Sequence, residues 1–308
     1  MRVLRGAIAE WGASAERTAV VIGVFDGVHL GHRALIDRLD PSLAPAVLTF
    51  DPHPVEVLRP GTPPRLITTL EERLKLLDEA EVELIGVLDL REIKEMAPET
   101  FVNQVLVDKF RVNQVVAGDD FRFGKDRAGD MALLRSMGGS HDFRVESIDL
   151  VERSGEAISS SRIRGLIETG HVGDASHLMG SWFTVTGGVI EGDKRGRLLG
   201  YPTANLRPPR RKVVPATGVY ACNAALGDRR LHSAVNVGVR PTFGGGELLI
   251  EGHLLEFDEE IYGEELTLEF VEYLRPELKF DSVDDLIAQM RQDVSEAATI
   301  LRTVPSRM

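Results

Sequence analysis

The sequence predicts an α/β doubly wound domain followed by a small antiparallel β-barrel domain with a C-terminal helix. Three observations support this expectation. Up to about residue 170, short apolar runs alternate with helical patterns, which is typical of a parallel sheet covered on both faces. After about residue 180, strands alternate with glycine-rich turns. A length of 308 residues allows two domains, and we expect them at residues 1–180 and 181–308.

Four short apolar runs predict the buried strands of the first domain, at residues 18–25, 46–50, 84–88 and 114–117. Helical patterns fill the gaps between these runs. One helix is expected to begin at Thr68, whose hydroxyl can cap it while Glu71 reaches back to the backbone. Another follows Pro98, a favourable first-turn residue. The last runs over residues 160–169 and ends at Gly170, which can adopt the left-handed conformation.

The second domain is expected to consist of strands closed by one helix. The strands are predicted at residues 183–186, 218–225, 231–237, 248–255 and 266–274. Ser282 and Asp285 can cap the helix, and its apolar residues lie at positions 286, 287, 290 and 294, which share one face. A small barrel with one covering helix follows from this pattern.

Composition excludes several classes of protein. With 43% hydrophobic and 27% charged residues, the chain is neither disordered nor fibrous. No stretch approaches the ~18 apolar residues of a membrane span, and the single cysteine, Cys222, forbids an intrachain disulfide, so we expect a cytoplasmic protein without a membrane partner. A net charge of −12 argues against a nucleic-acid partner but allows a small anionic ligand. A homo-oligomer stays open.

The turn after the first strand is suited to phosphate. Residues 23–32 are Gly-Val-Phe-Asp-Gly-Val-His-Leu-Gly-His. Gly27 and Gly31 let the backbone approach phosphate oxygens, while His29 and His32 share one face at a helix N-terminus, where amide donors favour an anion. The spacing fits neither the dinucleotide fingerprint nor the P-loop. Histidines that only cap a helix or bind a structural metal are the alternative at this point.

A distant segment, Ile-Ser-Ser-Ser-Arg-Ile-Arg at residues 158–164, offers three hydroxyls and two guanidiniums at a helix start. This set suits a triphosphate, and a plain serine cap with solvated arginines is the alternative. Together the two motifs resemble the nucleotidyltransferase superfamily marked by H-x-G-H and I-S-S-T-x-x-R, with Ser161 where threonine is usual. The resemblance implies that both segments converge on the phosphates of one adenine nucleotide.

The same resemblance implies roles for individual residues. His29, His32, Arg162 and Arg164 would be catalytic, stabilising charge on the α-phosphate and the departing pyrophosphate. The nucleotide would also contact the glycine-rich turn and the serines, at Gly23, Phe25, Asp26, Gly27, Gly31, Ser159, Ser160 and Ser161.

Two further loops narrow the family. Leu-Thr-Phe-Asp-Pro-His-Pro at residues 48–54 and Ala-Gly-Asp-Asp-Phe-Arg-Phe-Gly-Lys at 117–125 resemble the adenylyltransferase module of prokaryotic bifunctional riboflavin kinase/FAD synthetases. The resemblance implies a flavin site at Phe50, Pro52, His53, Asp120 and Phe121. Taken singly, the aromatic residues are more simply explained as core residues. As a set, they favour the flavin site.

The second domain opens with a glycine-rich flap and the run Pro-Thr-Ala-Asn, within residues 187–205. Thr203 and Asn205 offer oxygens to Mg²⁺, whose coordination the phosphates of ATP would complete. The flap would bind phosphate through backbone and charge, at Gly192, Lys194, Gly196, Arg197 and Gly200. This run resembles the riboflavin kinase module, and an ordinary hairpin connection is the alternative.

A kinase also needs a base for the acceptor hydroxyl, and Glu251 is the candidate. It lies in a segment, residues 248–257, that resembles the family segment whose glutamate acts on the ribityl hydroxyl of riboflavin. Arg275 and Glu277 match downstream family residues and are expected to bind the flavin. Gly252 and Ser181-Trp182 depart from the family pattern. A solvated, outward carboxylate at position 251 is the alternative.

The matches extend from about residue 20 to residue 293, in the order of the family. The resemblance implies that the second domain phosphorylates riboflavin with ATP to give FMN. The first domain would join AMP from a second ATP to FMN, giving FAD and pyrophosphate, and both reactions would need Mg²⁺. Riboflavin, FMN, FAD and ATP are then the expected partners. The alternatives are a monofunctional nucleotidyltransferase and a catalytically degenerate flavin sensor.

Overall fold

The computed structural model describes residues 1–59, 61, 63–149, 151–153, 155–192, 196, 199–242 and 245–304. Contacts group the chain into two compact units. The first comprises Met1–Pro64 and Thr68–Ser159, and the second comprises Arg65–Ile67 and Ser160–Met308. The second unit therefore begins about twenty residues before the expected domain boundary. That the two functional domains meet at residue 180 stays a prediction.

The first unit is built on a six-stranded sheet in which all neighbouring strands are parallel. Its order is β1-β4-β3-β2-β5-β6. The strands are β1 (Arg2–Leu4), β2 (Thr18–Ile22), β3 (Ala44–Phe50), β4 (Leu84–Leu88), β5 (Val112–Gly118) and β6 (Arg144–Ile148). β2 to β5 contain the predicted runs, although β2 ends before Phe25. β1 and β6 were not predicted, because they are short or only partly buried.

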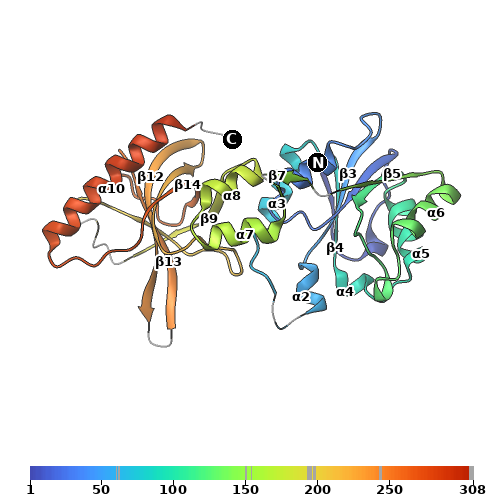
Figure 1. Cartoon of the computed structure of the whole chain (residues 1–308), viewed down its shortest axis with the longest axis horizontal. Helices are drawn as coiled ribbons and strands as arrows, with labels where there is room; N and C mark the ends of the chain where they lie inside the picture. The colour runs from blue at the N-terminus through green and yellow to red at the C-terminus, as the bar shows by residue number, and fades with distance from the viewer. Residues whose placement is uncertain are drawn as a thin grey trace. The chain divides into compact units, whose positions relative to one another are not determined.

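Helices cover both faces of this sheet, as the doubly wound prediction requires. Val20 and Ile22 pack into one hydrophobic cluster with Phe101, whereas Val21 packs into another with Leu77. Successive strand residues point to opposite faces, so one strand serves both cores. Figure 1 shows α5 and α6 on one side of the sheet and α3 on the other.

The connecting elements of the first unit are short. The α-helices are α1 (Leu30–Ile36), α2 (Pro54–Leu58), α3 (Leu70–Glu79), α4 (Leu90–Ile93), α5 (Pro98–Phe101) and α6 (Met131–His141). The remaining elements are η1 (Ile8–Glu10), the π-helical η2 (Val102–Lys109), η3 (Lys125–Arg127) and the β7–β8 pair (Glu152–Arg153, Glu156–Ala157). The helix expected after Pro98 is confirmed, and it continues into η2 with its apolar residues buried.

The cap predicted for α3 is wrong by one residue. Thr69, and not Thr68, is the N-cap, and it forms a capping box with Glu72 instead of Glu71. Both threonines have the chemistry of a cap, and the sequence alone could not choose between them. The choice is tertiary, because the hydroxyl of Thr68 is committed to the turn after β2.

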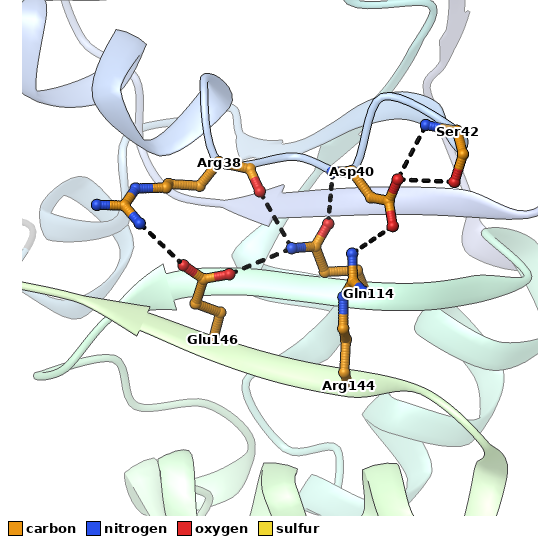
Figure 2. A network of polar contacts seen from close by, with 6 residues as sticks. All are labelled: Arg38, Asp40, Ser42, Gln114, Arg144 and Glu146. Carbon is orange, nitrogen blue, oxygen red and sulfur yellow. Dashed lines mark hydrogen bonds and ion pairs between the residues drawn. The ribbon is translucent and has the colours of Figure 1, made fainter.

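A buried glutamine joins three parts of the first unit at the amino end of its sheet (Figure 2). The side-chain oxygen of Gln114 on β5 accepts the backbone N–H of Asp40 at 2.7 Å. Its amide nitrogen donates to the carbonyl of Arg38 at 3.1 Å and to the carboxylate of Glu146 on β6 at 3.4 Å. Asp40 in turn pairs with Arg144. This network holds the loop between α1 and β3 against two strands.

The second unit is a closed barrel in the order β10-β13-β12-β11-β14-β9, which confirms the predicted class. Its strands are β9 (Phe183–Ile190), β10 (Ala204–Leu206), β11 (Gly218–Leu226), β12 (Arg229–Thr242), β13 (Gly245–Leu254) and β14 (Glu265–Arg275). β10 was not predicted. It closes the ring by pairing with both β9 and β13.

Among the described residues, the barrel is accompanied by α7 (Ser160–Glu168), α8 (Val172–Met179) and α10 (Val283–Thr303). Gly170 follows α7 with φ of +86°, in the left-handed conformation that was predicted. α10 begins at the expected cap, where the backbone N–H of Asp285 donates to the hydroxyl of Ser282 at 3.1 Å. It contacts β11, β12 and β14 and lies along one side of the barrel (Figure 1). No helix in the described ranges is both long enough and apolar enough to cross a membrane.

Candidate functional site

The turn between β2 and α1 has an unusual backbone. Phe25, Gly27 and Val28 have φ values of +55°, +90° and +39°. Positive φ is rare for non-glycine residues and costly for a β-branched one. Phe25 and Val28 are nonetheless fully buried, so packing of their side chains supports this backbone. The turn thereby directs the chain from the end of β2 into α1.

Asp26 and Thr68 anchor this turn from inside. The carboxylate of Asp26 accepts the backbone N–H of Thr68 at 3.0 Å and its hydroxyl at 3.3 Å. The same hydroxyl oxygen accepts the N–H of Gly27 at 3.0 Å. Asp26 is completely buried. Asp26 therefore shapes the turn, and the role expected for it in nucleotide binding stays a prediction.

The two histidines lie against one another as the motif predicts. Their rings stack with centroids 3.6 Å apart and planes 16° apart. His29 is the N-cap of α1, and its Nδ1 accepts the backbone N–H of His32 at 3.3 Å. A nitrogen that accepts carries no proton, so the neutral His29 ring bears its proton on Nε2. Gly31 makes room for this ring, because a Cβ there would lie 3.1 Å from Nδ1.

Burial keeps both imidazoles neutral at physiological pH. Loss of hydration lowers the pKa of His29 to about 4, against the opposing effect of nearby Asp26. Burial, together with the neighbouring His29 and Arg73, holds the pKa of His32 well below its usual value. His29 therefore offers an N–H donor rather than a permanent positive charge.

Arg73 on α3 supplies the permanent charge nearby, and the sequence motifs did not identify it. Its side chain is 1% exposed. Its Nη1 donates to the carbonyl of Phe50 at 2.9 Å, with the hydroxyl of Thr49 at 3.4 Å. The available signal was its spacing, since it shares the buried helix face with Leu70 and Leu77. This guanidinium holds the carboxyl end of β3 beside the histidines.

The first-unit residues expected to bind flavin lie at or just after the carboxyl ends of β3 and β5. Because these strands are parallel neighbours of β2, their carboxyl ends share one edge of the sheet, at the point where the strand order reverses. Phe50 ends β3, and a cis Asp51–Pro52 bond leads to His53, whose Nδ1 accepts the N–H of Val55 at 3.2 Å. Asp120 and Phe121 follow β5, and the ring of Phe121 stacks on Phe123 at 5.4 Å.

The serine–arginine segment approaches the histidine turn at its first residue. A Cβ on Gly31 would lie 3.5 Å from the carbonyl oxygen of Ile158, and Ser159 follows directly. Ser160, Ser161, Arg162 and Arg164 form the first turns of α7, which contacts group with the second unit. Their convergence with His29 and His32 on one triphosphate stays a prediction.

In the barrel, Glu251 lies between two asparagines. The register places Glu251 of β13 opposite Asn205 of β10 on one side and Asn236 of β12 on the other. Directly opposite residues of antiparallel strands project from the same face, with Cβ atoms roughly 5 Å apart. A carboxylate and two amides thus form one row across three strands. The sequence did not reveal Asn236, because its place depends on register alone.

Two cavities meet at this row. A cavity of about 310 Å³ is lined by Glu251 and Asn236, by Arg275 and Glu277, and by apolar residues of the α10 side that include Phe280, Leu286, Met290 and Val294. A smaller cavity, of about 60 Å³, is lined by Asn205, Gly192, Leu254, Phe257 and Tyr262 among others. Thr203 lines both cavities. The predicted apolar face of α10 therefore forms a wall of the larger cavity.

Asn205 presents an oxygen suited to a cation. The residue is 4% exposed, and within the described part of the chain no donor reaches its Oδ1. Its amide nitrogen lies 3.4 Å from the carbonyl of Thr203, which orients the oxygen the other way. Gly192 packs directly on this amide, where a Cβ would come within 2.6 Å of Cγ. Magnesium prefers such hard oxygen ligands, so the residues present fit it.

The rest of the flap is described only in part. Lys194 and Arg197 lie outside the described residues. The carbonyl of Gly196 accepts the N–H groups of Leu199 and Tyr201, and a Cβ on Gly196 would overlap the carbonyl of Tyr201. Gly200 has φ of +83°, as a tight turn requires. These two glycines shape the turn that leads to Thr203.

Arg275 and Glu277 line the larger cavity. The guanidinium of Arg275 donates to both carboxylate oxygens of Asp293 on α10, at 2.8 and 2.6 Å. A Cβ on Gly238 would lie 2.7 Å from a carboxylate oxygen of Glu277. Arg275 therefore also fixes α10 against β14, which sequence reasoning did not anticipate.

Comparison with known proteins matches each half of the chain to one of the two predicted modules. The FAD synthetase family model matches residues 12–162, and the riboflavin kinase family model matches residues 179–301. The protein named bifunctional riboflavin kinase/FMN adenylyltransferase in Escherichia coli K12 is 35% identical over 95% of this chain and 96% of its own length. The protein of the same name in Listeria monocytogenes is 37% identical over 89% of each chain.

A solved structure spans the same length. The crystal structure described as a macrolide-efflux protein from Streptococcus pneumoniae has a TM-score of 0.87 and 31% identity, covering 97% of each chain. The two family matches follow one another in the order that the motifs predicted. The chain therefore belongs to the family of bifunctional riboflavin kinase/FMN adenylyltransferases.

Proposed function

We propose that this chain carries out both reactions of its family in separate regions. Residues 181–308 transfer the γ-phosphoryl group of ATP to riboflavin, giving FMN and ADP. Residues 1–180 join the AMP moiety of a second ATP to FMN, giving FAD and pyrophosphate. The observation that carries the proposal is the position of Glu251, in line with two asparagines where two cavities meet at Thr203.

Each of the two cavities would bind one substrate of the kinase reaction. The larger one has an apolar wall on α10 and polar groups on β12 and β13, which suits a flat aromatic ring system with a polyhydroxyl chain. The smaller one borders the flap and Asn205, which suits the phosphates of ATP. Glu251 then takes the proton from the acceptor hydroxyl as its oxygen attacks phosphorus.

Thr203 and Asn205 are the residues that would hold Mg²⁺. The support is the buried Oδ1 of Asn205, which no donor of the described ranges satisfies, and the position of Thr203 at both cavities. The ion would neutralise charge on the phosphates of ATP when bound. Replacing Thr203 or Asn205 by alanine is expected to cause a kinase defect that raised Mg²⁺ partly relieves.

Adenylyl transfer needs different groups, because the phosphate of FMN is already an ionised nucleophile. What remains is to orient the α-phosphate and stabilise its developing charge. The Nε2–H of His29 offers one donor, and Arg162 and Arg164 would add charge. Phe50, Pro52, His53, Asp120 and Phe121 would bind the flavin at the carboxyl edge of the sheet.

Three variants test whether the two reactions use separate residues. Glu251→Gln is expected to reduce riboflavin phosphorylation at least ~10²-fold while FAD formation from supplied FMN is unchanged. His29→Asn keeps a cap acceptor and removes the Nε2 donor, and it is expected to reduce FAD formation by ~10²–10³-fold without affecting the kinase. Arg164→Ala should resemble the His29 variant.

Product chromatography with riboflavin, ATP and Mg²⁺ reads both steps. Sequential FMN and FAD support the proposal. FMN formation without FAD would contradict the first-domain assignment, and FAD formation from supplied FMN without riboflavin phosphorylation would leave a monofunctional nucleotidyltransferase. Flavin binding without turnover would indicate a sensor. We place the enzyme in the cytoplasm, where its buried thiol Cys222 stays reduced.

A further inference from the structure

His253 links the strand that carries Glu251 to the turn that carries Thr203. Its Nδ1 lies 2.8 Å from the carbonyl oxygen of Pro202. A carbonyl oxygen can only accept, so Nδ1 must carry a proton in this contact. The bond therefore persists whether the imidazole is neutral or cationic. Tyr201 packs its ring against the same imidazole, at 5.3 Å and 66°.

The position of His253 relative to Glu251 follows from strand geometry. The two residues are separated by one position on β13, so they project from the same face, and both line the larger cavity. The backbone of His253 is itself held, because its carbonyl accepts the hydroxyl of Ser233 on β12 at 3.0 Å. The imidazole thus extends from a fixed part of the barrel.

The turn that it reaches lacks support from the strand ladder. Pairing between β10 and β13 begins at Ala204, which lies opposite Gly252. Pro202 and Thr203 precede that pair and lie beyond the end of the ladder. The imidazole of His253 supplies a side-chain hydrogen bond where the backbone ladder has stopped. This bond acts on the residue directly before Thr203, which both cavities share.

We propose that His253 is a positioning residue for phosphoryl transfer, which fixes the Pro202–Thr203 turn at a set distance from Glu251. The proposal rests on the assignment of Glu251 and Thr203 given above. In-line transfer requires the acceptor hydroxyl to be aligned with the phosphorus that it attacks. A misplacement of ~1 Å can reduce the rate ~10²-fold. His253 takes no part in the chemical step. It aligns the phosphate side of the site with the base.

The two nitrogens of the ring can be tested separately. Asparagine places its amide nitrogen where Nδ1 was, whereas glutamine reaches toward the position of Nε2. If Nδ1 is what matters, His253→Asn retains at least a third of the kinase kcat. His253→Gln and His253→Ala lose ~10–10²-fold in kcat, with a raised KM for ATP.

Two further readouts separate positioning from other roles. The pH profile of kcat should keep its shape in His253→Asn, because the bond does not depend on the charge of the ring. FAD formation from supplied FMN and the melting temperature of each variant report whether the chain remains folded.

Several results would overturn the inference. The inference is wrong if His253→Gln, and not His253→Asn, retains the kinase kcat, or if all three variants have the wild-type kcat. It is also wrong if His253→Asn is as defective as His253→Ala, or if the pH profile of kcat changes in His253→Asn. The Glu251→Gln variant is measured alongside. If that variant remains active, the proposed kinase site is wrong, whereas an inactive Glu251→Gln with an active His253→Ala rejects only the role of His253.

Discussion

The carboxylate of Asp26 accepts the backbone N–H of Thr68 at 3.0 Å, across a separation of 42 residues. The hydroxyl of Thr68 then accepts the N–H of Gly27, so a single side chain holds the histidine turn from two directions. The first prediction follows from this pair. Thr68→Val should leave the buried N–H of Gly27 without this acceptor and remove one hydrogen bond to Asp26, and it should lower the free energy of unfolding by about 1–3 kcal/mol.

The same substitution should affect one activity more than the other. FAD formation is expected to fall ~10-fold because His29 and His32 follow this turn directly, while riboflavin phosphorylation is unchanged. Thr68→Ser keeps the hydroxyl and serves as the control. Urea unfolding and separate assays of the two activities check the prediction, and equal behaviour of the valine and serine variants would contradict it.

Gly192 offers a test of the flap that has a matched control in the neighbouring strand. Gly192→Ala would place a Cβ within 2.6 Å of Cγ of Asn205 and push its amide out of place. We expect the kinase kcat to fall at least ~10-fold and the Mg²⁺ requirement to rise. Gly188→Ala, where a Cβ has no atom within 4 Å, should retain wild-type kinase activity. The measurement is the kinase activity of both variants as a function of Mg²⁺ concentration. Equal activity of the two variants at every concentration would argue against a metal role for Asn205.

Acid should destabilise the fold through His29. Because burial lowers the pKa of His29 from 6.5 to about 4, the unfolded chain binds the extra proton between these values. Stability is therefore present above pH 6.5 and is lost as the pH falls towards 4. For this group alone, the loss between pH 7.5 and pH 5 is about 2 kcal/mol.

The His29→Asn variant isolates this contribution. Asparagine keeps the N-cap acceptor but does not titrate. Urea unfolding at pH 7.5 and pH 5 should show a loss of stability that is smaller in the variant than in the wild type by about 2 kcal/mol. The same pH dependence in both proteins would mean that His29 is not held neutral.

Gln114 should matter for stability and not for catalysis. Its side chain satisfies the N–H of Asp40 and the carbonyl of Arg38, and it is 1% exposed (Figure 2). Gln114→Leu leaves those two backbone groups without this partner, and the free energy of unfolding should fall by about 1–3 kcal/mol. The kcat of both reactions should remain at the wild-type value below the unfolding transition.

Arg144→Ala is the control for this network, because it removes only an exposed ion pair with Asp40. Ser42 and Arg144 together hold the pKa of Asp40 at about 2, so this carboxylate stays charged at any ordinary pH. The alanine variant should lose a small fraction of what Gln114→Leu loses. A larger loss in the alanine variant would contradict the ranking.

Local chemistry made the longer buried strands and several capped helices predictable. Runs of buried apolar residues located β2 to β5, and Ser282 and Gly170 marked the start of α10 and the end of α7 as expected. β10 escaped prediction because three residues carry too little periodicity, and α3 was predicted one residue early because Thr68 and Thr69 are chemically alike. Short elements and equivalent neighbours are where local signals fail.

The sequence by itself determined the family motifs, the two fold classes and the chemistry at each position, because these depend on residue type and spacing along the chain. Only the tertiary structure decided which groups meet. Asn236 and Asn205 flank Glu251 through strand register, and Arg73 lies buried at the end of β3 because α3 packs on the sheet. Register and packing bring together residues that are far apart in the chain, and local sequence patterns do not predict which of them come into contact.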